Sequence, residues 1–276
     1  MDIDVPVRFL DTIRVAPDTH LVRQLAGEGV NPVAMHCNSM VITGSEPVIV
    51  DCGPAITRDE WMARTFELVE PADVRWIFLS HDDVDHVGNL QQVLEVCRHA
   101  TVVSTAFMVE RMAADAMLPL DRLRWVNDGE TFRAGDRTFT AVVPPTFDSP
   151  TTRGLFDHST GVYWAADSFG APVPFEVDDI DDLPDGFYGP AFVQTQQLVS
   201  PWHQWLDPAK YQQQLDRIAA LGATVVASCH GVTLRDGQIA ASLELMQALP
   251  GAPAAVLPGQ AELEALLAML STGLAA

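Results

Sequence analysis

The sequence HDDVDHVG occupies residues 81–88 and follows directly on the apolar run WIFLS at 76–80. The run predicts a buried strand, and the amphipathic pattern of 89–99 predicts a helix after the loop. Two imidazoles and three carboxylates therefore stand within six residues at the end of a strand. Crowded carboxylates repel one another and lose hydration, so we expect a pair of bound cations here rather than a capped helix N-terminus.

Three further predicted strands end in residues of the same kind. The strand at 138–143 leads into Asp148, the strand at 161–166 ends at Asp167, and the strand at 224–229 ends at His230. Ligand sites of layered α/β proteins gather where strand ends meet. We therefore expect the four ends to converge on one metal site.

The rest of the chain alternates between strand and helix patterns. A hairpin is predicted from 37–43 and 48–51, with short strands at 101–104, 123–126 and 131–133. Helices are predicted at 58–70 with Thr57 as N-cap, at 106–117, and at 207–221 with Asp207 as N-cap and Pro208 behind it. The acidic stretch 176–190 is expected to be a long loop, and 157–159 an exposed turn. We expect one domain over residues 1–276, with a C-terminal helical extension from about 240.

Composition narrows the class of protein. A hydrophobic fraction of 48% against 19% charged residues is enough for a globular core. The net charge of -21 would repel nucleic acid and anionic membranes, so neither is an expected partner. The sequence contains no phosphate-binding GxxxxGK[ST] and no GxSxG nucleophile motif. The four cysteines form no CxxC pair, and we find no secretory signal or long apolar span, so a cytoplasmic protein with free thiols is expected.

Several motifs in the correct order resemble the metallo-β-lactamase superfamily over roughly residues 30–235. The matching segments are HCNSMVI at 36–42, VDCG at 50–53, HDDVDHVG at 81–88, ADSFG at 166–170 and SCHG at 228–231. The resemblance implies an α/β fold, the four-layer αββα sandwich of that superfamily. Asp51 resembles an aspartate that supports the ligands in the superfamily, and capping of a turn is the alternative.

The resemblance also implies a ligand set. The superfamily motif is HxHxDH, and an acid at the second position, here Asp83, resembles the flavodiiron and oxygen-binding diiron branch. By that alignment one metal is held by His81, Asp83 and Asp148, the other by Asp85, His86 and His230, and Asp167 bridges them. Asp148 stands where the branch has a histidine, and His158 is the alternative source of an imidazole.

The implied cofactor is a pair of metal ions. Four carboxylates and three imidazoles favour iron, with manganese or zinc as alternatives. The implied function is to bind or reduce oxygen or nitric oxide. Reductases of this branch carry a flavodoxin-like domain, for which the stretch after His230 is too short, so electrons are expected from a separate partner. The alternative is a hydrolase of an ester, lactone, amide or phosphodiester, in which Asp85 orients a metal-bridging hydroxide. A binding module that holds no metal, or only a structural metal, is the third alternative.

The last predicted helix, 260–270, carries an apolar stripe. Leu263, Leu266, Leu267 and Leu270 follow the spacing i, i+3, i+4, i+7. Such a stripe is covered either by the helix's own domain or by a second copy of the chain. We predict a homodimer.

Overall fold

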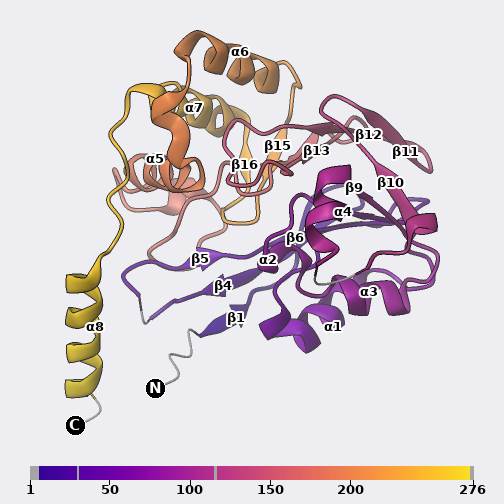
Figure 1. Ribbon diagram of the computed structural model, residues 1–276, viewed down its shortest axis with the longest axis horizontal. Coiled ribbons are helices and arrows are strands. Elements are labelled where there is room, and N and C mark those ends of the chain that lie inside the picture. The colour runs from indigo at the N-terminus through magenta and orange to yellow at the C-terminus, as the bar shows by residue number, and fades with distance from the viewer. Residues whose placement is uncertain (1–5, 30, 115–116, 274–276) are drawn as a thin grey trace.

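The computed structural model describes residues 6–29, 31–114 and 117–273. Within these ranges two large sheets lie face to face, and helices cover the outer face of each sheet (Figure 1). The αββα sandwich expected from the sequence is confirmed.

Strand order places the chain segments that carry the site. One sheet has the order β10 (Leu123–Trp125), β9 (Thr101–Ser104), β8 (Trp76–Phe78), β7 (Val48–Val50), β6 (Ser39–Ile42), β3 (Thr19–Val22), β2 (Ile13–Ala16). The other has the order β11 (Thr131–Ala134), β12 (Arg137–Val142), β13 (Gly154–Asp157), β14 (Val162–Trp164), β15 (Val225–Ala227), β16 (Leu234–Arg235). In this second sheet β14 and β15 are parallel, and β12 shares their direction because β12 and β14 are both antiparallel to β13. The chain therefore leaves β12, β14 and β15 at the same edge.

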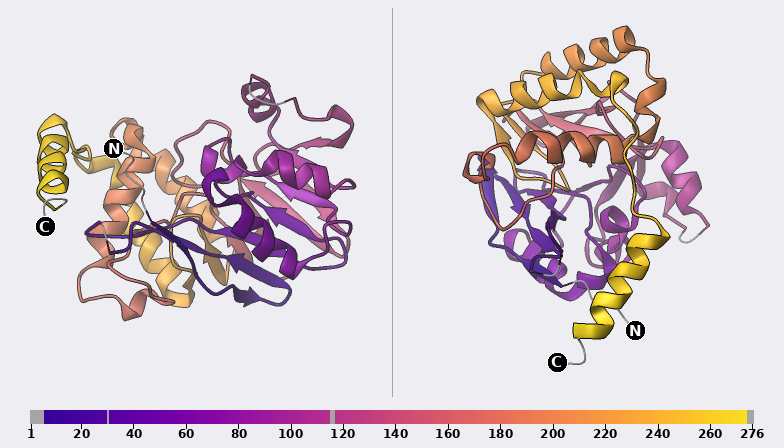
Figure 2. Two further views of the ribbon diagram at one scale, coloured as in Figure 1. Left: turned by 90° about the horizontal axis from the view of Figure 1, so that it is seen from below. Right: turned by 90° about the vertical axis from the view of Figure 1, so that its left-hand side faces the viewer.

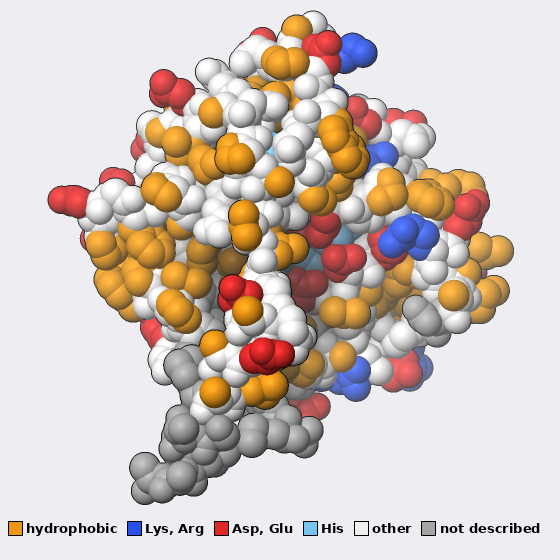
Figure 3. Space-filling view, turned by 60° about the vertical axis from the view of Figure 1, so that its left-hand side comes forward, with side chains coloured by type: hydrophobic (Ala, Val, Ile, Leu, Met, Phe, Trp, Pro, Cys, Tyr) orange, Lys and Arg blue, Asp and Glu red, His pale blue; other side chains and the backbone are white. Residues whose placement is uncertain are grey.

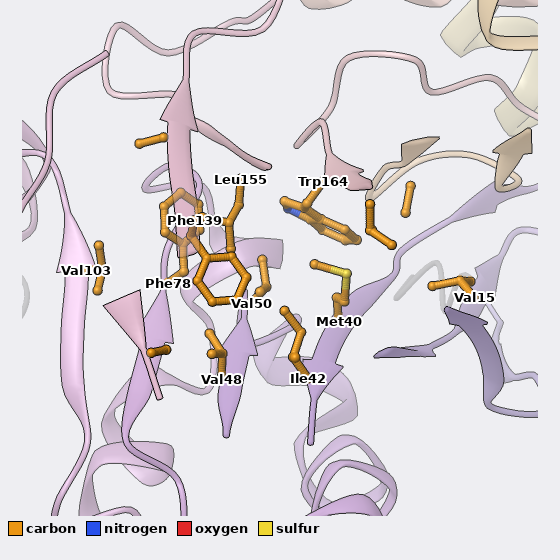
Figure 4. Packing of buried hydrophobic residues seen from close by; sticks show 14 of the residues in the cluster. Val15, Met40, Ile42, Val48, Val50, Phe78, Val103, Phe139, Leu155 and Trp164 are labelled. Carbon is orange, nitrogen blue, oxygen red and sulfur yellow. The ribbon is translucent and has the colours of Figure 1, made fainter. Parts of the chain in front are cut away.

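An apolar core joins the two sheets. In β6, Met40 and Ile42 face the opposite sheet, whereas Val41 faces the outer helices. Neighbouring side chains of a strand lie on opposite faces, so a strand covered on both faces is apolar at successive positions. Figure 4 shows this inner layer, to which Phe139 and Trp164 contribute large, fully buried rings.

Helices form the two outer layers (Figures 1 and 2). The first sheet is covered by α1 (Arg58–Leu68), α3 (Leu90–Val96) and α4 (Ala106–Met112), and the second by α5 (Tyr188–Val199), α6 (Pro208–Ala219) and α7 (Asp236–Met246). The one-turn helix α2 (Val84–Val87) lies within the HDDVDHVG loop. Short 3-10 helices span Ala55–Thr57, Leu120–Arg122, Ile180–Asp182, Pro201–Trp205 and Leu249–Gly251.

Some local predictions are confirmed and others are wrong. The Asp207 side chain caps α6 by accepting from the N–H of Lys210, as predicted. The Thr57 side chain makes no capping bond, because a 3-10 turn precedes α1, and its hydroxyl donates to Gln24 instead. The predicted loop 176–190 gives way to α5 at Tyr188, since a proline in the first turn of a helix costs no intrahelical hydrogen bond.

Several strands were not predicted, because each has only two to four residues and alternation is weak over such lengths. They include β2, β3 and a small separate sheet of β1 (Val7–Phe9), β4 (Gln24–Ala26) and β5 (Met35–His36). The segment 157–159, predicted as an exposed turn, begins with the buried last residue of β13. There Asp157 pairs with Arg137, and only His158 and Ser159 of the three are exposed.

The last helix, α8 (Gln260–Gly273), projects from the rest of the chain (Figures 1 and 2). Leu263, Leu266 and Leu267 of the predicted stripe are 40% to 46% exposed, and the side chain of Leu270 lies outside the described residues. By contrast, α7 packs Ile239 and Met246 into the outer core of the second sheet. In the described part of the chain, every helix is too short or too polar to cross a membrane.

Candidate metal centre

The predicted site residues meet at one edge of the sandwich. HDDVDHVG follows β8, and the segments with Asp148, Asp167 and His230 follow β12, β14 and β15. Their exposure differs: the side chain of Asp167 is 6% exposed and that of Asp148 is 37% exposed. Acidic side chains gather around a hollow on the surface, with a histidine at its floor (Figure 3). The site therefore has a buried base and an open acidic rim.

One group of side chains surrounds the imidazole of His81. Its Nε2 lies 3.2 Å from Oδ2 of Asp167, 3.8 Å from Oδ2 of Asp83 and 3.9 Å from Oδ1 of Asp148. Both Asp83 and Asp148 belong to the rim, whereas the His81 side chain is fully buried. These residues could hold one metal ion.

A second group adjoins the first. The Nε2 atom of His86 lies 3.0 Å from Oδ1 of Asp167 and 3.6 Å from Oδ2 of Asp85. The Nε2 atom of His230 lies 3.2 Å from the same Asp85 oxygen and 3.4 Å from the same Asp167 oxygen. Asp167 thus turns one carboxylate oxygen toward His81 and the other toward His86 and His230.

The buried atoms of the site lack hydrogen-bond partners. Three buried atoms have no aligned hydrogen bond: Nε2 of His81, Nε2 of His86 and Oδ1 of Asp167. The last two lie 3.0 Å apart. A buried polar atom left in this state costs about 1–3 kcal/mol. Potential ligand atoms that converge in a buried position without aligned hydrogen bonds suit a cation, so the residues fit a metal centre.

A buried carboxylate behind the site orients two imidazoles. Asp51, at the end of β7, accepts from Nδ1 of His86 (2.9 Å), from the indole of Trp164 (3.0 Å), and from both the backbone N–H and the hydroxyl of Ser80 (2.7 Å each). The Ser80 hydroxyl also lies 3.1 Å from Nδ1 of His81. With Nδ1 engaged on this side, each ring directs Nε2 toward the site.

The third imidazole is oriented by backbone. Nδ1 of His230 donates to the carbonyl oxygen of His36 over 2.8 Å. The amide of Asn38 donates to the carbonyls of Ser228 and Gly231, which fixes the turn that carries His230. These bonds tie the entrance of β6 to the segment after β15.

The charges of the site shift the pKa values of its members. Burial lowers the pKa of both His86 and His230, but nearby carboxylates outweigh it, raising the pKa of His86 well above its usual range and that of His230 to about 10. Burial would raise the pKa of Asp167, yet the two histidines hold it well below its usual range. The pKa of Asp148 is raised by burial and by the charge of Asp167. Without metal the imidazoles hold the protons, and a cation that binds displaces them.

All seven sequence-predicted residues lie in this cluster, and His158 does not. The His158 ring contacts the hydroxyl of Thr140 at 2.7 Å, beyond the end of β13 remote from the site. Asp82, the remaining acid of the motif, binds Ser149, Thr151 and Arg111 and so anchors neighbouring loops.

Two contributors were missed by the sequence analysis. Ser80 and Trp164 support Asp51, and their positions beside the strand ends carry no distinguishing sequence signal. Cys229, expected from the sequence only as a free thiol, also adjoins the site. It is fully buried, but its Sγ lies 3.9 Å from Oδ2 of Asp85 and can join the second ligand group.

Fold and site define an αββα protein whose strand ends carry two adjoining groups of metal-ligand side chains. The chain belongs to the metallo-beta-lactamase superfamily, whose family model matches residues 33–230.

Among curated relatives, a putative diflavin flavoprotein A 1 from Thermosynechococcus vestitus is 29% identical over 135 residues, 49% of this chain and 24% of the relative. A putative diflavin flavoprotein A 3 from Nostoc is 25% identical over 170 residues, 58% of this chain and 29% of the relative. The chain therefore spans about a quarter of the length of the curated relatives it matches first.

Solved structures share the fold. The flavodiiron protein from Giardia intestinalis superposes with a TM-score of 0.75 at 16% identity, covering 88% of this chain and 60% of that one. A fragment of a putative diflavin flavoprotein A 5 from Nostoc gives a TM-score of 0.67 at 17% identity, covering 88% of this chain and 97% of the fragment.

Proposed function

We propose that this site holds two iron ions and that the protein binds or reduces dioxygen or nitric oxide. The position of Asp167 is the observation that carries the proposal, since its two oxygens face two different ligand groups. His81, Asp83 and Asp148 would hold one ion, and Asp85, His86 and His230 the other. Asp167 would contact both.

The donor set supports iron or manganese over zinc. Four carboxylates can balance the charge of two divalent ions, and hard oxygen donors suit iron and manganese better than a site made mainly of imidazoles does. The names of the structural neighbours agree with this choice, because they include flavodiiron proteins and the rubredoxin oxygen:oxidoreductase of Desulfovibrio gigas, which has a TM-score of 0.74 at 16% identity.

Two bound ferrous ions would supply the redox chemistry for a diatomic gas. The residues of the chain orient and protect that centre. Asp51 and Ser80 hold two imidazoles in place, and the buried base of the site keeps bulk water from His81 and His86. The half-exposed rim leaves a path for a small molecule. Turnover requires electrons, which we propose come from a separate partner.

Metal analysis of protein purified without added metal tests the proposal. We expect two iron ions per chain, or iron with manganese, and consumption of oxygen or nitric oxide when a chemical reductant is supplied. Stoichiometric zinc together with hydrolysis of a model ester would instead establish the hydrolase, with Asp85 orienting the attacking hydroxide.

Two variants check the ligands. His86→Ala and Asp167→Ala should each lower metal content and activity with only a modest loss of fold, because both residues lie outside the apolar core between the sheets. Full metal loading of both variants would contradict the assignment.

A further inference from the structure

Two of the four cysteines lie next to each other beside the metal centre. Cys37 stands just before β6, and Cys229 directly precedes His230. The backbone N–H of Asn38 donates to the carbonyl oxygen of Cys229 over 2.9 Å. The backbones are joined by this bond, and Cys37 packs against the buried cluster that contains Cys229, so the two side chains are neighbours. Both cysteines are free thiols.

The backbone between them suits a disulfide. The Asn38 to Cys229 bond joins the peptide unit after Cys37 to the peptide unit after Cys229, so the two α-carbons lie near a single hydrogen bond. A disulfide spans about 4.4 to 6.8 Å between α-carbons, so it joins only residues whose backbones are close neighbours, as these two are. The bonds from His230 to His36 and from Asn38 to Ser228 fix the two segments on both sides of the pair. A disulfide between the two cysteines would join segments that these bonds already hold together.

The two sulfurs differ in access, and so do the remaining cysteines. Cys37 is half-buried, whereas Cys229 is fully buried behind it. Cys52 and Cys97 are also fully buried, within the core under α1 and α3. A small oxidant can therefore reach Cys37 first, with Cys229 in place to react next.

We infer that Cys37 and Cys229 form a reversible disulfide, a second redox site beside the metal centre that is oxidised by hydroperoxides and reduced by dithiols. In the first step the Cys37 sulfur bonds to a peroxide oxygen, the O–O bond breaks, and water leaves for hydrogen peroxide. In the second step the Cys229 sulfur attacks the resulting sulfenic acid, the S–O bond breaks, and a second water leaves with the Cys229 proton. Two thiols are oxidised and one peroxide is reduced.

Reduction runs by exchange. One thiol of a dithiol attacks the disulfide, its second thiol closes a new ring, and both cysteines leave as thiols. While the disulfide exists, the segment that carries His230 is joined covalently to the entrance of β6. The inference needs no particular metal and does not rest on the proposed diiron function; it requires only that the Cys229 thiol is not bound to a metal ion.

Peptide mapping of the full chain tests the inference. The protein as purified is treated with a small excess of hydrogen peroxide and then denatured in the presence of an alkylating agent, which blocks the free thiols. It is then cleaved with cyanogen bromide and afterwards with trypsin. The sequence separates the four cysteines under this treatment: Cys37 on 36–40, Cys52 on 41–58, Cys97 on 76–98 and Cys229 on 218–235. We expect a linked pair 36–40 with 218–235, alkylated Cys52 and Cys97, and loss of the linked pair after dithiothreitol.

Variants and metal measurements complete the design. Cys37→Ser should abolish the linked pair, and the matched control Cys97→Ala should retain it. Wild-type protein in which Cys37 and Cys229 remain alkylated, or in which Cys37 is oxidised to the sulfinic acid without a link to Cys229, overturns the inference. Metal content is measured on the same samples, so a zinc protein that still forms the link separates failure of the diiron proposal from failure of this one.

Discussion

Replacement of Asp51 by asparagine isolates the charge behind the metal centre. The carboxylate accepts four hydrogen bonds, from His86, Trp164 and two groups of Ser80. Asparagine preserves the volume and tolerates the left-handed φ of 59° at this position. Its amide nitrogen cannot accept, so in either orientation of the side chain at least one buried donor loses its acceptor.

The expected magnitudes follow from these contacts. A hydrogen bond to a charged group contributes about 1.5–3 kcal/mol, and a buried donor without a partner costs about 1–3 kcal/mol. We therefore expect Asp51→Asn to lower the free energy of unfolding by about 2–4 kcal/mol. The loss of a carboxylate that supports a ligand histidine weakens metal binding about 10- to 100-fold, equivalent to about 1.4–2.7 kcal/mol.

The two effects are measured separately. Urea unfolding of the metal-free protein gives the stability, and competition with a chelator gives the metal affinity. Asp157→Asn is the matched control. Like Asp51, Asp157 is a buried, hydrogen-bonded aspartate; its partner is Arg137, and it lies at the end of β13 remote from the metal centre. The control should lose stability and keep wild-type metal affinity. If Asp51→Asn behaves in the same way as the control, Asp51 stabilises the fold without orienting a ligand, and our interpretation is refuted.

Three further predictions concern the rim, the pH dependence and the last helix. Asp148→His should still bind metal but favour zinc. His158→Ala should leave metal content unchanged, because the His158 ring contacts Thr140 beyond the far end of β13. If only His158→Ala loses metal, the alignment that places Asp148 as the ligand is wrong. Because the pKa of His230 is raised to about 10, its stabilising interactions are fully present below about pH 6.5 and are lost as pH rises toward 10. Urea titrations of the metal-free chain should therefore show the free energy of unfolding falling over this interval. Over the same interval, chelator competition should show metal affinity rising by up to about tenfold per pH unit for each proton that the metal displaces. A metal-free chain that gains stability over this interval would contradict the raised pKa. Deletion of residues 259–276 should convert a dimer to a monomer in light scattering; an undiminished dimer would exclude α8 as the contact, and a monomeric full-length chain would exclude the dimer.

Much of this protein is determined by local sequence. The hairpin of β6 and β7 follows from two apolar runs separated by Gly44, Ser45 and their neighbours, and α6 follows from Asp207 and Pro208 at its start. The sequence also shows which potential ligands follow the strands, because an apolar strand must end before a histidine or an aspartate. Short strands such as β13 escape this kind of analysis, since three or four residues hold too little periodicity.

Tertiary structure alone decides how these residues meet. Which oxygen of Asp167 faces which imidazole depends on how the two sheets pack, and the sequence holds no record of that orientation. The same packing places Asp51 behind His86 and brings the backbone after Cys37 beside that of Cys229, although each pair is distant along the chain. Sequence therefore determines which donors stand at the strand ends. The fold determines which of them share a cation, because only the contact between sheets sets distances across the site.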